Sequence, residues 1–450
     1  MKWQVEPERP SKERGLDSHP VLYTLLACFL TAIVVFLATF FALSEHYVDE
    51  MEDYRAHYVK RSDKYDNGLL DAALGLLDTD SLFDLPNRSE LTEAMIEAAI
   101  AAMGDRYGTF FTDAEYAEYS ADTITGNFVG IGVTVQPLGV EGARIVLVHD
   151  GSPAKESGLL AGDVIVSADG VRFADGYDAA FNAIAGEAGS VVTISFLRDG
   201  EEMTKEITRA QVVKQTVIPR IETYGGASVG CVYISGFDGH TYEQFRKAVS
   251  DLETAGVDAL LFDLRGNPGG VLTEVAKVLA YLLPDGVIAY VDYASDSIPD
   301  YTISSENGYV KYGSTDSERY QEGGHRITLP VAVLVNGSTA SAAELFTAAL
   351  RDYATPAFGS ALDVTVVGTT TYGKGTVQTH SVLGGGNILK MTVARYNPPS
   401  NENYDGVGIE PGLRVELPPE EEAVSVYLRT QENDSQLRAS LELLSQKVNP

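Results

Sequence analysis

The sequence predicts a layered α/β domain that carries a smaller β-rich module and follows an apolar segment long enough to cross a membrane. Residues 21–43 contain no charged side chain. Short stretches of alternating apolar residues, separated by turn glycines, fill positions 125–212. From about residue 230, continuous apolar strands alternate with amphipathic helices, which is the pattern of a layered α/β domain.

The overall composition excludes several classes of function. The 450 residues are 44% apolar and 22% charged, which is ordinary for a globular protein. Asp and Glu number 64 against 33 Lys and Arg, which gives a formal net charge of −31. A chain this acidic is a poor general binder of nucleic acid, because phosphate neutralisation needs clustered Lys and Arg. We therefore expect no nucleic-acid partner.

The cysteines and histidines argue against a metal centre. Cys28 and Cys231 lie far apart and no CxxC pair exists, which excludes a zinc ribbon or a disulfide framework. The seven histidines are scattered and form no HExxH motif. We expect no metal and no cofactor.

Residues 21–43 are expected to form a transmembrane helix. At 1.5 Å per residue the helix would be about 34 Å long, which is enough to span a bilayer core. The exit of the run, from Phe41 to Ser44, is a weak signal-peptidase site, so an uncleaved anchor is preferred to a cleaved signal peptide.

Basic residues near this run predict its orientation. The 15 residues before it contain three and the 15 after it contain one, although wider windows of about 20 residues give equal counts. These residues are Arg9, Lys12 and Arg14 before the run and Arg55 after it. By the positive-inside rule, residues 1–20 form a cytoplasmic tail and residues 44–450 lie outside the cytoplasm.

The rest of the chain divides into four segments. Residues 44–120 look helical and carry no chemical motif, and we expect them to pack or dimerise. Residues 121–212 form the β-rich module, residues 213–417 the α/β domain and residues 418–450 a C-terminal helical tail. Within the α/β domain, strands are predicted at 232–235, 259–264, 330–335 and 364–367, and residues 286–328 are expected to be excursions or short strands.

The segment VNGSTASAAE, from Val335 to Glu344, joins a predicted strand to a predicted helix. Ser341 and Glu344 have the spacing of a capping box, which is a purely structural interpretation. The chemical alternative is a nucleophile at a helix N-terminus, where free N–H groups and the helix dipole stabilise an oxyanion. This segment by itself favours the cap.

A second segment, from Thr371 to Gln378, places Lys374 between two glycines. A solvated turn lysine is the structural interpretation. A lysine that acts as a general base must be neutral, and at an ordinary pKa near 10.4 only about one molecule in 2,500 is neutral at pH 7. Burial against apolar walls lowers the pKa by several units, which makes a Ser-Lys pair workable.

A third segment, FDLRGNPGG from Phe262 to Gly270, lies at the end of a predicted strand. Its glycines can turn their N–H groups toward an oxyanion, although a simple turn explains the segment equally well.

Other catalytic arrangements are absent from the sequence. There is no GxSxG elbow and no GxxxxGK[ST] loop. His380 is the only histidine near these segments and has no obvious Asp partner, which disfavours a Ser-His-Asp triad.

Together these segments resemble the carboxy-terminal processing proteases, also called tail-specific proteases. The resemblance covers roughly residues 90–415. Each piece is modest alone, and all of them in this order are highly specific. The pieces are FVGIGV (128–133), GSPAKESGLLAGDVI (151–165), VYISGF (232–237), FDLRGNPGG (262–270), VLVNGSTASAAE (333–344), TYGKGTVQ (371–378) and ARYNPPS with GVGIEP (394–411).

The resemblance implies a crotonase-like α/β catalytic domain at 213–417 with an inserted PDZ domain at 121–212. It also implies a Ser-Lys dyad helped by a glutamine. By position, Ser341 attacks the scissile carbonyl, Lys374 takes its proton and passes it to the leaving amine, and Gln378 orients the lysine.

The resemblance also assigns binding groups. The oxyanion donors are the N–H of Ala342 and that of Gly269 or Gly270, between which the sequence does not choose. In the PDZ domain, Ile131, Gly132 and Val133 fit the loop whose amides hold a C-terminal carboxylate. The adjacent strand can then take the substrate tail by β-augmentation. In the family this domain also gates access to the site.

Two features depart from the family pattern. The usual second serine, two residues after the nucleophile, is Ala343. The separation between Ser341 and Lys374 is about eight residues longer than expected, with the extra length near 354–363, and a surface insertion of that kind is tolerable.

The sequence therefore predicts a single-pass membrane serine endopeptidase with its PDZ and catalytic domains outside the cytoplasm. Its expected substrates are proteins or peptides with free, unstructured C-terminal regions, and a homo-oligomer through the terminal helices is expected. The alternatives are a PDZ-bearing scaffold with an inactive protease domain and an adaptor that delivers tails to another enzyme. The joint presence of Ser341, Lys374 and Gln378 argues against the inactive scaffold.

Overall fold

The computed structural model describes residues 67–449, except 308, 314–315 and 320–324. The predicted cytoplasmic tail and transmembrane helix, residues 1–43, lie outside the described residues. Among the residues that are described, no helix is long and apolar enough to cross a membrane. The chain divides into two compact units, residues 1–92 and residues 93–450.

The segment predicted to be helical, 44–120, is described from residue 67 and is mostly but not entirely helical. Its helices are α2 (Asn67–Asp80), α3 (Arg88–Met103) and α4 (Asp113–Tyr119), and the short strand β1 (Thr109–Phe111) lies between α3 and α4. The prediction of a wholly helical segment was wrong at β1, because this strand owes its conformation to pairing with residues 388–390, far along the chain. Helix α4 begins with a complete capping box between Thr112 and Glu115.

The core of the second unit is a six-stranded sheet in the order β10-β11-β12-β17-β18-β21. From β11 onward the strands of this sheet run parallel to one another, and β10 is antiparallel to β11. Four of these strands, β11, β12, β17 and β18, are those that the apolar runs predicted. The bounds are β10 (Val217–Tyr224), β11 (Ala227–Ile234), β12 (Ala259–Asp263), β17 (Val331–Val335), β18 (Val364–Gly368) and β21 (Leu413–Arg414).

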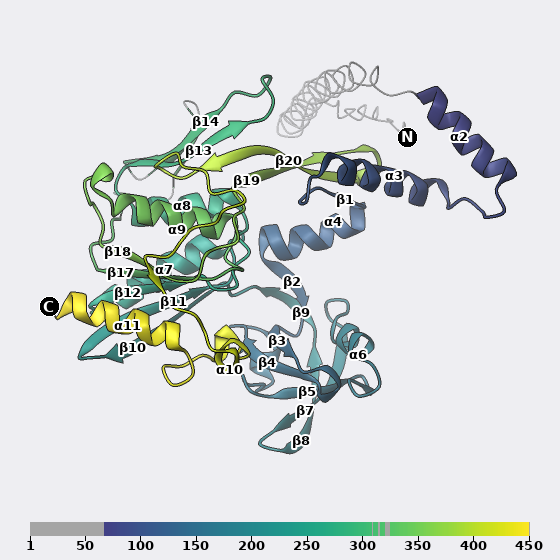
Figure 1. Ribbon diagram of the computed structural model, residues 1–450. Coiled ribbons are helices and arrows are strands. Elements are labelled where there is room, and N and C mark those ends of the chain that lie inside the picture. The colour runs from purple at the N-terminus through teal and green to yellow at the C-terminus, as the bar shows by residue number, and fades with distance from the viewer. Residues whose placement is uncertain (1–66, 308, 314–315, 320–324, 450) are drawn as a thin grey trace, which may run out of the picture. The chain divides into compact units, whose positions relative to one another are not determined.

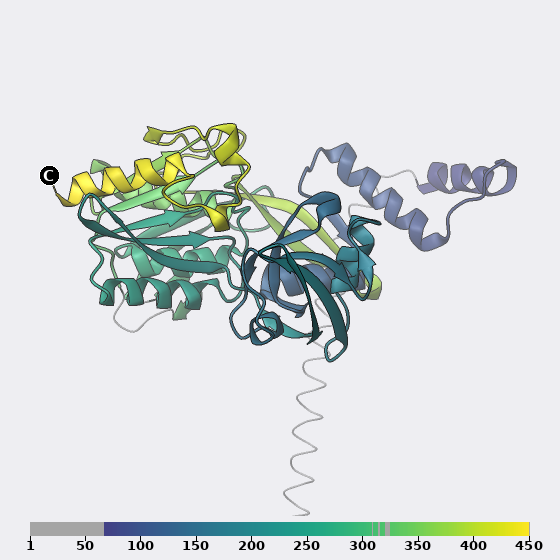
Figure 2. The same ribbon diagram turned by 90° about the horizontal axis from the view of Figure 1, so that it is seen from below.

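Helices cover both faces of this sheet (Figure 1; Figure 2). Helices α7 (Thr241–Thr254), α8 (Leu272–Leu282) and α9 (Ala342–Tyr353) lie on one face, and α11 (Ser435–Val448) lies on the other. Successive residues of a strand enter different cores: Leu260 and Phe262 pack under α7 to α9, whereas Leu261 packs under α11. Strands buried on both faces are continuously apolar, which is why the sequence predicted them well.

The described residues of 286–319 form much of a second sheet. Its order is β1-β20-β13-β14-β15-β16, with β19 also paired to β20. Its remaining strands are β13 (Gly286–Tyr293), β14 (Tyr301–Glu306), β15 (Tyr309–Tyr312), β16 (Asp316–Arg319), β19 (Thr376–Val382) and β20 (Ile388–Asn397). Strand β19 follows the segment that carries Lys374, so this sheet positions that segment.

The β-rich module forms a sheet in the order β3-β4-β5-β7-β8, with β3 at an edge. It has its own apolar core. The chain enters the module through β2 (Asn127–Gly130) and leaves through β9 (Ala210–Val213), which pair antiparallel, as expected for an inserted module. The other elements are β3 (Val133–Pro137), β4 (Ala143–Val148), α5 (Pro153–Glu156), β5 (Val164–Ala168), β6 (Val171–Arg172), α6 (Tyr177–Ile184), β7 (Val191–Arg198) and β8 (Glu201–Thr208).

The C-terminal tail is part of the α/β domain's own core. After the short helix α10 (Pro419–Glu422), helix α11 buries Leu437, Leu441 and Leu444 completely against the sheet. Burial of each leucine contributes about 2 kcal/mol to folding. This apolar stripe is occupied within the chain and is not free to contact a second copy.

Candidate active site

Ser341 lies at the point where β17 leads into α9, in a strained backbone conformation. Its φ of 54° and ψ of −121° lie outside the regions that a side chain normally allows, and such strain concentrates at functional sites. The glycine segment that follows β12 lies directly against it. A Cβ on Gly269 would be only 2.7 Å from the Cβ of Ser341 and 2.8 Å from the nitrogen of Ala342, so this close approach requires glycine.

One buried carboxylate joins the Ser341 turn to the Lys374 loop. Glu344 is fully buried, and its Oε2 accepts the N–H of Ser341 at 2.9 Å and the N–H of Lys374 at 2.8 Å. Its Oε1 accepts the N–H of Gly373 at 2.7 Å and the hydroxyl of Thr371 at 2.5 Å. The bond to Ser341 belongs to the capping box that the sequence predicted. The other three make Glu344 the link between the two segments.

Lys374 is largely buried, with its Nζ 4.4 Å from the centroid of the Tyr107 ring. Desolvation by burial lowers its pKa below the ordinary 10.5, and the charge of Lys390 lowers it further, against opposing effects of Asp105 and Glu344. Among the described residues its Nζ makes no hydrogen bond to Ser341. The two side chains are thus placed on adjoining loops, and the ammonium faces an aromatic ring.

Gln378 lies in β19, next to a bulge in the pairing of β19 with β20. Its Nε2 donates to the hydroxyls of Thr376 at 3.2 Å and Thr392 at 3.3 Å, and not to Lys374. Thr392 in turn donates its N–H and its hydroxyl to Asp105, both at 2.8 Å. Burial raises the pKa of Asp105, but these bonds outweigh it and hold the pKa below the ordinary value.

The glycines that the sequence singled out differ in their bonding. The N–H of Gly269 donates to the side chain of Asn267 at 2.8 Å. The N–H groups of Gly270 and Ala342 have no hydrogen-bond partner in the part of the chain that the structure describes. The N–H of Ala340 donates to the carbonyl of Asn267 at 2.9 Å, which holds the glycine segment against the Ser341 turn.

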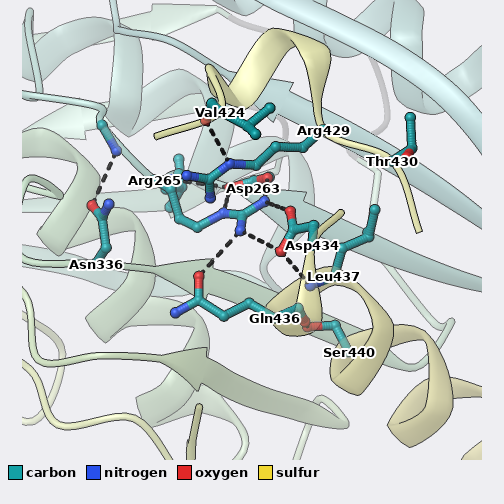
Figure 3. Close-up of polar contacts among 12 residues, drawn as sticks. Asp263, Arg265, Asn336, Val424, Arg429, Thr430, Asp434, Gln436, Leu437 and Ser440 are labelled. Carbon is teal, nitrogen blue, oxygen red and sulfur yellow. Dashed lines mark hydrogen bonds and ion pairs between the residues drawn. The ribbon is translucent and has the colours of Figure 1, made fainter. Parts of the chain in front are cut away.

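A buried ion-pair network fixes the start of this glycine segment (Figure 3). Arg265 is 1% exposed and lies between two carboxylates. It donates to Asp263 through Nε at 2.9 Å, to both oxygens of Asp434 at 2.9 and 2.7 Å, and to Gln436 at 3.1 Å. Burial disfavours its charge, but the two carboxylates hold its pKa above the ordinary value. Because Asp434 caps α11, the network ties the C-terminal helix to the active-site loop.

The predicted carboxylate loop lies between β2 and β3. The Ile131 side chain is buried in the core of the module, and its carbonyl accepts the N–H of Ala154 at 2.8 Å. The carbonyl of Gly132 accepts the N–H of His149 at 3.0 Å. No described residue accepts the N–H of Ile131 or Gly132, so these two donors are open beside the edge strand that begins at Val133.

Other chemistries find no support in the described residues. His380 packs against the rings of Tyr116 and Tyr119, with ring centroids 5.5 and 5.7 Å away, and contacts no carboxylate there. No group of three or more His, Cys, Asp or Glu side chains that could hold a metal occurs in the described ranges.

Comparison with known proteins identifies two domains. Residues 228–415 match the model of peptidase family S41, and residues 129–208 match the model of the PDZ domain. The chain is 32% identical to the carboxy-terminal processing protease CtpB of Bacillus subtilis over 339 residues, which cover 74% of this chain and 64% of that protein. Residues 228–415 therefore form a peptidase S41 domain, and residues 129–208 form a PDZ domain.

Further relatives support the assignment. A carboxyl-terminal-processing protease of Synechocystis is 29% identical over 80% of this chain and 78% of its own length. The crystal structure of a putative S41 protease from Bacteroides fragilis has the same fold, with a TM-score of 0.54 and 19% identity over 81% of this chain and 93% of that one. The chain spans a little under two thirds of the length of the Bacillus subtilis relatives CtpB and CtpA, 64% and 65%.

Several residues of this S41 site were missed by the sequence reasoning. Asp105 and Tyr107 lie in the loop between α3 and β1, far from Lys374 along the chain, and no quoted motif contains them. Tyr396 lies in the ARYNPPS segment, to which the sequence assigned no role. Arg265 could have been found from the sequence. Asp263 and Arg265 are charged residues at the end of an apolar strand, and charged side chains in such a place need buried partners.

Proposed function

We propose that this chain is a membrane-anchored serine endopeptidase that cleaves unstructured C-terminal regions of extracytoplasmic proteins with Ser341, Lys374 and Gln378. The observation that carries the proposal is the Glu344 carboxylate, which binds the N–H groups of both Ser341 and Lys374. The crotonase-like relationship of the domain remains a prediction. The membrane anchor at 21–43 and the extracytoplasmic location rest on the apolar run and the basic residues before it.

In the proposed mechanism, neutral Lys374 takes the hydroxyl proton of Ser341 as the Ser341 oxygen attacks the scissile carbonyl carbon. The resulting oxyanion accepts hydrogen bonds from the free N–H groups of Ala342 and Gly270. Gly270 is chosen over Gly269 because the N–H of Gly269 already donates to Asn267. Lys374 then passes the proton to the leaving amine, which leaves an ester on Ser341. A water molecule, deprotonated by Lys374, attacks this ester and restores the hydroxyl.

Gln378 acts in this proposal from the network that also contains Thr392 and Asp105. Its bond to Thr392 ties β19 to β20, and β19 begins two residues after Lys374. We therefore assign Gln378 to the placement of the lysine.

The PDZ domain supplies the selection of substrate. The open N–H groups of Ile131 and Gly132 suit a terminal carboxylate, and edge strand β3 can pair with the extended tail behind it. The proposed partners are therefore polypeptides with free C-termini.

The test is cleavage of casein, an unstructured protein, by the full chain purified in detergent micelles with EDTA present. We expect wild type to cleave and Ser341→Ala, Lys374→Ala and Lys374→Arg not to cleave. Arginine retains a cation of similar length but never becomes neutral, so it separates base chemistry from charge. Equal cleavage by all four proteins would contradict the site assignment. Binding of a C-terminal peptide without any cleavage by wild type would favour the PDZ-bearing scaffold.

A further inference from the structure

Tyr396 is a buried tyrosine of β20 that binds the Lys374 loop twice. Its side chain is 2% exposed. Its backbone N–H donates to the carbonyl of Gly375 at 3.2 Å, and its phenol donates to the carbonyl of Lys374 at 2.9 Å. Tyr396 lies in the ARYNPPS segment, to which the sequence assigned no role, and no step of the proposed mechanism uses it.

The buried phenol keeps its proton. Burial raises the pKa of Tyr396 well above its ordinary value. The phenol is therefore neutral at physiological pH, and it donates its single proton to the carbonyl of Lys374.

We propose that Tyr396 is a positioning residue of the Ser-Lys site, whose phenol fixes the backbone of Lys374. The inference rests on the proposed function and deepens it. The peptide groups of Lys374 are held on both sides, the N–H by Glu344 and the carbonyl by Tyr396, so the lysine side chain starts from a fixed backbone. Catalysis depends on such placement to within a fraction of an ångström.

The chain contains a matched control for this role. Tyr353 in α9 is 5% exposed, and its phenol donates to the backbone carbonyl of Val287 at 3.0 Å. Tyr353→Phe and Tyr396→Phe therefore delete the same kind of buried hydrogen bond, one away from Ser341 and Lys374 and one beside them.

The experiment uses the full chain in detergent micelles and two readouts. The first is the second-order rate of labelling of Ser341 by a fluorophosphonate, which needs no peptide substrate. The second is kcat and KM for casein cleavage. For Tyr396→Phe we expect the labelling rate and kcat to fall about tenfold, with KM changed less than about twofold. For Tyr353→Phe we expect both rates to equal those of wild type.

Rates are expressed per folded molecule, with the folded fraction taken from near-ultraviolet circular dichroism at 10 °C. A loss confined to thermal stability, with both rates of Tyr396→Phe equal to those of Tyr353→Phe, would overturn the inference. If wild type is neither labelled by the fluorophosphonate nor able to cleave casein, and so behaves like Ser341→Ala, the proposed function itself fails. The inference then fails with it.

Discussion

The ammonium nitrogen of Lys374 lies 4.4 Å from the centroid of the Tyr107 ring. The face of an aromatic ring attracts an ammonium group but not a neutral amine, so this contact favours the protonated lysine. Burial acts in the opposite direction and lowers the pKa of Lys374. Both effects contribute to the pH above which Lys374 can accept a proton.

We predict that Tyr107→Leu moves the acid limb of kcat/KM for casein cleavage to lower pH by about 0.5 to 1 unit. The substitution removes an attraction of about 0.5–2 kcal/mol for the charged form while keeping an apolar wall. A lower pKa means that the lysine is neutral at lower pH, so the limb moves down. Tyr107→Phe keeps the ring and should leave the limb in place. An equal shift in both variants, or a shift in neither, would contradict this account.

Glu344→Gln is expected to reduce both stability and cleavage. The carboxylate accepts four hydrogen bonds, and an amide loses the charge and turns an N–H group toward these donors. We expect the free energy of unfolding to fall by about 2–3 kcal/mol in urea titrations. The control is Glu410→Gln, an exposed side chain that accepts one hydroxyl at 2.8 Å and should cost less than about 0.5 kcal/mol. Similar losses in both variants would sink the prediction.

Asp434→Asn tests whether the C-terminal helix is anchored by its buried ion pair. Removing one partner of a buried pair should cost about 3 kcal/mol of unfolding free energy at pH 7. Asp363→Asn is the control, since its exposed pair with Lys447 holds the other end of the same helix and should cost less than about 1 kcal/mol.

The Asp434 contribution should also depend on pH. Burial raises the pKa of Asp434, but hydrogen bonds and the charge of Arg265 outweigh it and hold the pKa below the ordinary 3.8. A carboxyl group whose pKa is lower in the folded state stabilises the fold at pH values above its unfolded-state pKa. This stabilisation is lost as the pH falls through the folded-state pKa. The stability difference between wild type and Asp434→Asn should therefore be largest near neutral pH and shrink below pH 3.8. A difference that stays constant down to about pH 2 would argue against ion pairing.

Gly132→Ala should weaken capture of a C-terminal carboxylate by the PDZ domain. At φ of +85° an added Cβ would lie 2.2 Å from the Cβ of Ser152, so the loop must move. Gly139→Ala is the matched control, because it has a φ of +62° and open space around it. We expect at least about tenfold weaker binding of a fluorescent peptide with a free C-terminus for Gly132→Ala only. An amidated peptide should bind poorly to all three proteins, and strong binding of it would exclude carboxylate recognition.

The sequence by itself determined the elements whose physical cause is local. Strands β12 and β17 are buried on both faces, so they are continuously apolar and were predicted without reference to the rest of the chain. The segments around Ser341 and Lys374 each had a structural interpretation, but their order along the chain matched a known family.

Tertiary structure decided everything that depends on contacts between distant segments. Strand β1 exists because it pairs with β20, some 280 residues later, and no local pattern announces such a pairing. Glu344 was predictable as a cap within four residues, but its bonds to Gly373 and Lys374 needed the fold to bring that loop to α9. The same holds for Tyr396 and Asp434, because a buried polar group is defined by its partners, and periodicity along a chain carries no record of partners on other elements.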